Sequence, residues 1–163
     1  MSCIEIKGRC KDEYKSLAKK TAEEVICFMK FPNELEVAIE FVSEREIQRL
    51  NSEFRNIDKV TDVLSFPSFE ISAGEILDLK NQDYLAFRQE NGFYHFGDMA
   101  ICLKQTQRQA KEFGVTTQSE IKKLVIHSML HLMGYDHIKD EDYAVMKKQE
   151  ENLDKLIGEK YGF

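Results

Sequence analysis

The chain has 163 residues, with 29 Asp and Glu against 23 Lys and Arg and a formal net charge of −6 at pH 7. This balance excludes a protein that coats nucleic acid through overall positive charge, although it allows a local basic groove. No apolar run approaches the length of a membrane span, charge stands where a signal peptide needs apolar residues, and the four cysteines form no CxxC pair. We expect a single cytoplasmic domain over residues 1–163, with free thiols and no membrane partner.

Hydrophobic periodicity predicts both strands and helices. Strict alternation of apolar and polar residues indicates half-buried strands, most clearly at residues 35–41, whereas apolar residues three and four apart indicate amphipathic helices. Ser43 with Glu46, and Thr117 with Glu120, have the spacing of capping boxes, which predicts two helix starts. The predicted strands are residues 3–7, 35–41, 63–66 and 98–103, and the predicted helices are 12–29, 43–53, 105–113, 140–157 and one from Thr117 to the break at Gly134.

The order of these elements predicts the fold class. Strands and helices are mixed without strict alternation, which is typical of an α+β domain with a small mixed sheet covered by helices. Residues 70–94 show no clear period, so no element is assigned to them.

Three of the four histidines lie close together, at positions 127, 131 and 137. His127 and His131 are four residues apart, so on a helix their rings project from the same face and can bind one cation. Gly134 can take the left-handed conformation that ends a helix, which lets the chain turn back and bring His137 to the same cation. Three imidazoles suit zinc and leave one tetrahedral position open for water, whose pKa zinc lowers to about 7. We therefore predict one zinc ion on a zincin-like helix.

Spacing alone leaves the role of this metal open. A closed structural site normally has four ligands, often with cysteine, and only three side chains are visible here. In HExxH metalloproteases the glutamate that acts as general base directly follows the first histidine, where this chain has Ser128. A serine hydroxyl is too weak a base at neutral pH, which weakens the alternative of a metallopeptidase without excluding it.

Other polar residues could support the site. Asp62, Asp98 and Asp136 are candidates to orient the histidine rings, although hydrogen bonding in turns and caps is an equal alternative for each. His95 lies outside the cluster among aromatic residues and could approach the metal, but isolated histidines usually have other roles.

Three sequence blocks extend the pattern beyond the histidines. They are TDVLSFP at residues 61–67, which follows Asn51 and Arg55, then GDMAI at 97–101 and HSMLHLMGYDH at 127–137. In this order the blocks resemble the signatures of the YbeY endoribonucleases, a family of bacterial metal-dependent rRNA maturation factors. The resemblance spans roughly residues 43–137. The chain departs from the family pattern at Ser128, Ile57 and Val60, where the family usually has glycine, lysine and proline.

The resemblance implies a function and partners. It implies an α+β fold, zinc held by the three histidines, and cleavage of single-stranded RNA in rRNA maturation and ribosome quality control. The implied partners are rRNA and the ribosome or its proteins, and DNA is not expected. Arg55 matches an arginine that the family places near the metal and uses for activity. A guanidinium can bond two phosphate oxygens at once, and without the resemblance a surface ion pair would be an equal interpretation.

Further cations are candidates for RNA binding. Lys59 lies in the loop after Arg55, and Lys104, Arg108 and Lys111 recur at helical spacing on one face of a predicted helix. We predict that these residues bind RNA, with a solvated helix face as the equal alternative. The remaining alternative for the whole chain is a non-enzymatic module that binds RNA or the ribosome and uses the metal only for structure.

Overall fold

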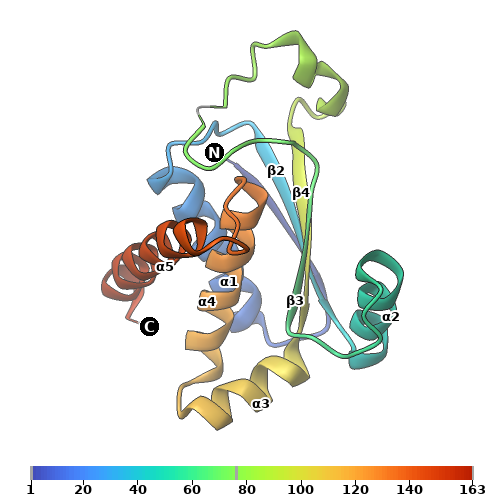
Figure 1. Ribbon diagram of the computed structural model, residues 1–163, viewed down its shortest axis with the longest axis vertical. Helices are drawn as coiled ribbons and strands as arrows, with labels where there is room; N and C mark the ends of the chain where they lie inside the picture. The colour runs from blue at the N-terminus through green and yellow to red at the C-terminus, as the bar shows by residue number, and fades with distance from the viewer. Residues whose placement is uncertain (1, 76, 163) are drawn as a thin grey trace.

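The computed structural model of the protein describes residues 2–75 and 77–162 (Figure 1). In chain order the elements are β1 (Cys3–Gly8), α1 (Asp12–Phe28), β2 (Leu35–Val42), α2 (Glu44–Arg55), β3 (Val63–Pro67), the 3-10 helix η1 (Gln82–Phe87), β4 (Tyr94–Cys102), α3 (Leu103–Phe113), α4 (Thr117–Leu132) and α5 (Asp140–Tyr161). Every helix and strand predicted from the sequence is present, with some differences at the ends. Among the described residues, no helix has the length and apolar character needed to cross a membrane.

Four strands form one sheet in the order β1-β2-β4-β3. β1, β2 and β4 run parallel, and β3 pairs antiparallel with β4 at the edge. The prediction of a small mixed sheet in an α+β fold is therefore confirmed. Because the parallel strands point the same way, their carboxyl ends meet at one edge of the sheet, where β2 leads into α2 and β4 leads into α3.

The two faces of the sheet are covered differently (Figure 1). Helices α1 and α4 pack on one face, and α5 packs against α4. The core under these helices includes alternate residues of β2, namely Leu35, Val37, Ile39 and Phe41. Helix α2 covers part of the opposite face over a smaller core, formed by Ile47, Leu64, Ala100 and Cys102. The alternation at residues 35–41 thus predicted the four apolar core residues correctly, but Glu36 between them is buried as well.

The start of β4 was predicted wrongly. The strand begins at Tyr94 and not at residue 98, and the backbone N–H of Tyr94 donates to the carbonyl of Glu34 at 2.7 Å. Tyr94 and Phe96 are both buried, but His95 between them and Gly97 after them obscure the apolar pattern. Pairing with β2 therefore extends the strand beyond what its own sequence indicates.

The cap of α4 was predicted one residue too late. Thr116, and not Thr117, has the extended backbone of a cap, and its hydroxyl accepts a hydrogen bond from the N–H of Ser119 at 3.0 Å. Glu120 is buried and accepts from Gln109, so its side chain is used between helices. The other predicted cap is confirmed, because the hydroxyl of Ser43 accepts from the N–H of Glu46.

Gly97 in β4 allows α4 to approach the sheet closely. A Cβ atom at this position would lie 2.7 Å from Cδ2 of Leu132 and 2.9 Å from the carbonyl oxygen of Phe66. Leu132 is fully buried and directly follows His131 at the end of α4. The missing side chain of Gly97 therefore sets how deeply the histidine-bearing end of α4 packs against the sheet.

We expect the Gly97→Ala substitution to lower the free energy of unfolding by about 1–3 kcal/mol, because the added methyl group must displace Leu132 or the strand backbone. Urea denaturation measures this loss. The same substitution in a Leu132→Ala background should cause a smaller additional loss, because one of the two contacts is already gone. Equal losses in the two backgrounds would contradict this account of Gly97.

Candidate metal centre

The three histidines of the predicted cluster lie together. His127 and His131 are on α4, and His137 is in the segment after it. One ligand nitrogen of each ring lies within 4.8 Å of the others. The Nε2 atoms of His127 and His131 are 3.0 Å apart, and two nitrogens bound to one tetrahedral zinc at about 2.1 Å would be roughly 3.4 Å apart. The donor set therefore fits a single small cation.

A sharp turn after α4 returns the chain to the cluster. The helix ends at Leu132, and Gly134 has a φ of 91°, in the left-handed region predicted for it. The N–H of Tyr135 then donates to the carbonyl of Leu130 at 3.0 Å. A Cβ atom on Gly134 would lie 2.1 Å from the carbonyl oxygen of Ile71, so both conformation and space require glycine here.

Two of the rings are held through their Nδ1 atoms. Nδ1 of His127 lies 2.6 Å from a carboxylate oxygen of Glu150 on α5, and Nδ1 of His131 lies 2.9 Å from the carbonyl oxygen of Tyr135. Both partners accept hydrogen bonds, so each Nδ1 carries the proton and each Nε2 presents its lone pair to the cluster. This is the tautomer that a metal ligand needs.

The surroundings of His131 disfavour protonation of its ring. Burial lowers its pKa, and the neighbouring His127 lowers it further, so that the pKa falls from 6.5 to about 4 despite the hydrogen bond to the Tyr135 carbonyl. The ring is therefore neutral at neutral pH. A neutral imidazole is the form that binds a metal.

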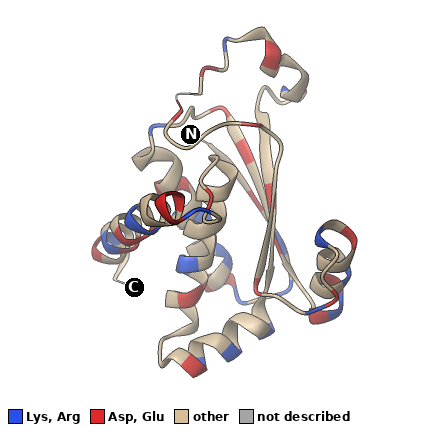
Figure 2. Ribbon diagram, in the orientation of Figure 1, with Lys and Arg blue, Asp and Glu red and all other residues tan. Residues whose placement is uncertain are grey.

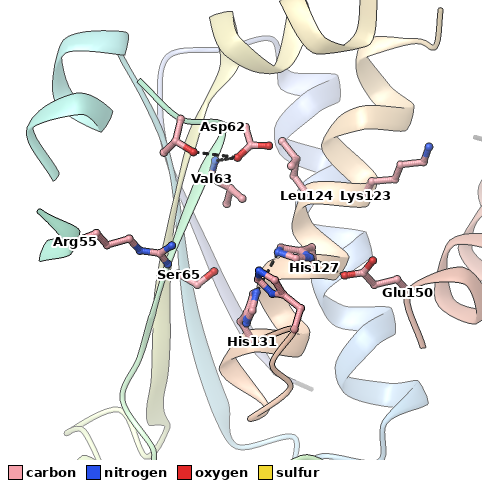
Figure 3. A pocket seen from close by; sticks show the side chains of 11 residues that line it. Arg55, Asp62, Val63, Ser65, Lys123, Leu124, His127, His131 and Glu150 are labelled. Atoms are coloured by element: carbon pink, nitrogen blue, oxygen red, sulfur yellow. Dashed lines mark hydrogen bonds and ion pairs between the residues drawn. The ribbon is translucent and has the colours of Figure 1, made fainter. Parts of the chain in front are cut away.

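The histidines lie in a pocket of about 360 Å³ between α2, β3, α4 and α5. Arg55, at the end of α2, extends past β3 toward the cluster from one side, while Lys123 and Glu150 lie on the other side (Figure 3). The pocket is lined by Arg55, Thr61, Asp62, Val63, Ser65, Lys123, Leu124, His127, His131, His137 and Glu150. It combines two cations and two carboxylates with three imidazole rings that could hold a metal ion.

The loop between α2 and β3 determines where Arg55 lies. Asn56 ends α2 in the left-handed conformation, with a φ of 57°. Asn51 is buried, and its side-chain amide donates to the carbonyl oxygen of Lys59 at 3.0 Å. These two asparagines fold the loop back onto its helix. The side chain of Lys59 is exposed and does not line the pocket.

The predicted basic face of α3 is also outside this pocket. Lys104, Arg108 and Lys111 are all exposed, and none lines the pocket of the histidines. Arg108 donates to the carboxylate of Glu44 at 2.8 Å, so its charge is partly neutralised. The structure thus separates this face from Arg55.

None of the three predicted aspartates holds a cluster histidine among the described residues. Asp62 lines the pocket but accepts from the N–H of Val63, and Asp136 accepts from the N–H of Ile138 in a turn. Asp98 bonds to His95 instead. The turn alternative is therefore correct for Asp136, whereas Asp62 also accepts a hydrogen bond from the side-chain amide of Gln109 on α3 at 3.1 Å.

His95 belongs to a separate polar group. Its Nε2 lies 2.8 Å from Asp98, and its Nδ1 lies 3.5 Å from Glu36. Burial opposes protonation of the ring, but these two carboxylates outweigh it and raise the pKa of His95. His95 is also absent from the lining of the histidine pocket, so it does not approach the cluster.

Ser128 connects α4 to the sheet. It is fully buried, and its hydroxyl oxygen lies 2.5 Å from that of Ser65 on β3. This bond directs Ser128 toward β3, so the position next to His127 offers no base to the cluster. The contact also ties the metal-binding helix to the strand whose residues form the pocket wall.

Comparison with known proteins identifies the family. The family model described as endoribonuclease YbeY matches residues 4–158. The chain belongs to the YbeY endoribonuclease family. An endoribonuclease YbeY of Clostridium botulinum is 33% identical over 149 residues, covering 90% of each chain. Another, from Caldicellulosiruptor saccharolyticus, is 43% identical over 116 residues, covering 71% of this chain and 69% of that relative.

A solved structure has a similar fold. The solution structure of TM1509 from Thermotoga maritima is 28% identical, has a TM-score of 0.64, and is matched over 97% of this chain and 91% of its own. The family model and the two endoribonuclease relatives confirm the resemblance to YbeY drawn from the sequence motifs. Membership makes this chain one of a family of endoribonucleases, which are hydrolases.

Two charged residues of the pocket, Lys123 and Glu150, were missed by the sequence analysis. Lys123 lies four residues before His127 and therefore on the same helix face, a spacing that could have revealed it. Glu150 is on a different helix, and no spacing relates it to His127. Only the packing of α5 against α4 brings its carboxylate to the ring.

If the cluster holds a metal ion, we expect the Glu150→Gln substitution to weaken the affinity of this protein for added zinc about 10–100-fold, because an amide cannot favour the correct tautomer of His127 as a carboxylate does. Competition with a chromophoric chelator measures this affinity. Glu151→Gln, at the exposed neighbouring position, is the matched control and should bind zinc as the parent does. Parental affinity in the Glu150 variant would exclude an orienting role for Glu150.

Proposed function

We propose that this chain is a zinc-dependent endoribonuclease that cleaves single-stranded RNA in rRNA maturation and ribosome quality control. The observation that carries the proposal is one pocket, in a chain of the YbeY family, lined by both Arg55 and the three histidines. The proposal includes rRNA as substrate, the ribosome or its proteins as partners, and a cytoplasmic location. The printed names of the relatives state an endoribonuclease, which agrees with this substrate class.

The metal-binding part of the mechanism rests on three rings. His127, His131 and His137 would hold the zinc ion through the nitrogens that converge in the pocket. When bound there, zinc supplies Lewis-acid stabilisation of negative charge on a phosphoryl oxygen and lowers the pKa of water. Glu150 keeps His127 in the required tautomer, and the carbonyl of Tyr135 does so for His131.

Arg55 contributes the second part of the mechanism, the binding of phosphate. Cleavage of a phosphodiester increases negative charge on the phosphoryl oxygens in the transition state. A guanidinium donates two parallel hydrogen bonds to such oxygens, and Arg55 reaches the pocket from the side opposite Lys123. We assign Arg55 the role of binding the scissile phosphate and stabilising its transition state.

The same geometry disfavours a metallopeptidase. Ser128 bonds to Ser65 and faces away from the cluster. The carboxylate of Glu150 is hydrogen-bonded to Nδ1 of His127, so it orients that ring. A pocket that places Arg55 beside the three histidines, with its one glutamate bound to His127, suits a phosphate better than a peptide bond.

We expect Arg55→Glu to retain zinc but to reduce cleavage of single-stranded RNA at least about 100-fold, because the variant loses a donor to the developing charge and adds a repelling one. Elemental analysis and a gel-based cleavage assay measure the two effects. Arg88→Glu, which makes the same charge change outside the pocket, is the control and should cleave normally. His131→Ala should lose both zinc and cleavage.

Cleavage at the parental rate by Arg55→Glu would remove this residue from the mechanism. Arg55→Lys refines the test, because it keeps the charge but not the bidentate geometry. We expect it to recover only part of the activity.

We expect removal of zinc by a chelator to abolish RNA cleavage while the protein stays folded. The neighbours of the histidines on α4, including Ile126, Met129 and Leu130, are buried in the core, so apolar packing holds this helix. Circular dichroism reports the fold, and a parallel panel of RNA and peptide substrates reports activity. Unfolding on chelation would support a purely structural metal, and chelator-sensitive cleavage of peptides but not RNA would support a peptidase.

A further inference from the structure

A second hollow lies at the carboxyl ends of the parallel strands. It has a volume of about 820 Å³ and is bordered by the ends of β1 and β2 and by the first residues of α2 and α3. In sheets of this kind the crevice at the strand carboxyl ends is a common place for ligands. The hollow shares no lining residue with the histidine pocket.

Three cations line this hollow, namely Arg9, Arg45 and Lys104. Gly8 places Arg9 there: its φ is 98°, and a Cβ atom on it would lie 2.1 Å from the carbonyl oxygen of Phe41 in β2. Only glycine allows β1 to end this close to β2 and turn outward. All three cationic side chains are exposed, and in the described part of the chain none forms an ion pair within 4.0 Å.

The acidic residues beside these cations are mostly engaged elsewhere. Glu44 accepts from Arg108 at 2.8 Å, and Glu46 accepts from Arg49 at 2.7 Å. Neither arginine lines the hollow. Arg108 pairs with Glu44 from outside it, and Arg49 is shared between Glu46 and Glu53. Of the lining acids, Glu40 alone has no ion pair among the described residues. The hollow is lined by as many carboxylates as cations, but its three cations have no ion-pair partner among the described residues, whereas two of its three carboxylates do.

Helix α2 connects this hollow to the histidine pocket. It begins at Glu44, beside the hollow, and ends at Arg55, in the pocket. Twelve residues of helix span roughly 18 Å at 1.5 Å per residue. Further Lys and Arg positions continue from Lys104 along α3 (Figure 2). An extended anionic chain could thus contact both places at once, whereas a short one could not.

We propose that the hollow, here called the strand-end groove and defined by Arg9, Arg45 and Lys104, binds phosphates of a single-stranded RNA whose scissile phosphate lies in the histidine pocket. The choice of RNA rests on the proposed function. Exposed arginine and lysine side chains contact phosphates without reading bases, so the groove adds affinity for longer strands and no sequence preference. This role also gives Lys104 a place in RNA binding that is separate from Arg55.

The test is a variant with Arg9→Gln, Arg45→Gln and Lys104→Gln together, in the zinc-loaded protein. Its affinity for a long single-stranded RNA with methylated 2′-hydroxyls is measured by fluorescence anisotropy over a range of salt concentrations, and a gel verifies that the strand stays intact. Single-stranded binding loses a salt slope of about 0.7 per phosphate contact, so the slope should flatten by about two. At low salt we expect binding at least about tenfold weaker.

A matched control makes the same charge change elsewhere, with Lys30→Gln, Lys80→Gln and Arg88→Gln. These exposed cations lie on segments that precede β2 and β4, away from the strand carboxyl ends. The control should keep the parental slope, and thermal melting should show both variants folded. An equal loss in both variants, or no loss in either, would overturn the proposal.

Two further outcomes separate this proposal from the proposed function. If the parent binds RNA through the groove but cuts no RNA, the groove stands and the endoribonuclease assignment fails. If the groove variant loses binding to poly-glutamate and keeps its binding to RNA, the groove is a surface for acidic proteins and the proposal is overturned.

Discussion

The tautomer of two imidazole rings is the constraint on which the site depends. Nδ1 of His127 and Nδ1 of His131 each face a fixed acceptor, a carboxylate of α5 and the carbonyl of Tyr135. With the protons held there, both Nε2 lone pairs point at the same small volume. Burial keeps His131 neutral, so the ring is ready to bind a cation at neutral pH. The rest of the fold serves to keep these two acceptors in place.

Close packing of α4 makes that arrangement possible. On one side Gly97 and the pair of Ser65 with Ser128 bring α4 against the sheet, and on the other side α5 carries Glu150 to His127. The pocket opens between these layers, and α2 adds Arg55 from beyond the edge strand β3. A site built from elements far apart in the sequence is therefore positioned by one helix packed in the core.

The features that the sequence predicted correctly are those that depend on neighbouring residues of the chain. The i, i+4 spacing of His127 and His131 and the left-handed glycine at position 134 depend only on helix geometry, and the structure agrees with both. The cap at Ser43 and the buried alternation of residues 35–41 are equally local. The start of β4 was missed because pairing with β2 extends the strand past His95 and Gly97. The true cap of α4 was missed because Glu120 bonds Gln109 on α3 and Thr116 caps the helix instead of Thr117.

The sequence by itself determined the ligand trio, the helix that carries it, the α+β class and the family, since these follow from periodicity and from contiguous motifs. Only the tertiary structure decided which acidic residue holds a histidine, because Glu150 and His127 are related by helix packing and not by spacing. It also separated the cations into two places: Arg55 lies with the histidines, and Lys104 lies with Arg9 and Arg45 at the strand ends. A linear pattern shows which charges a chain has, but the topology of the sheet determines which of them share a surface.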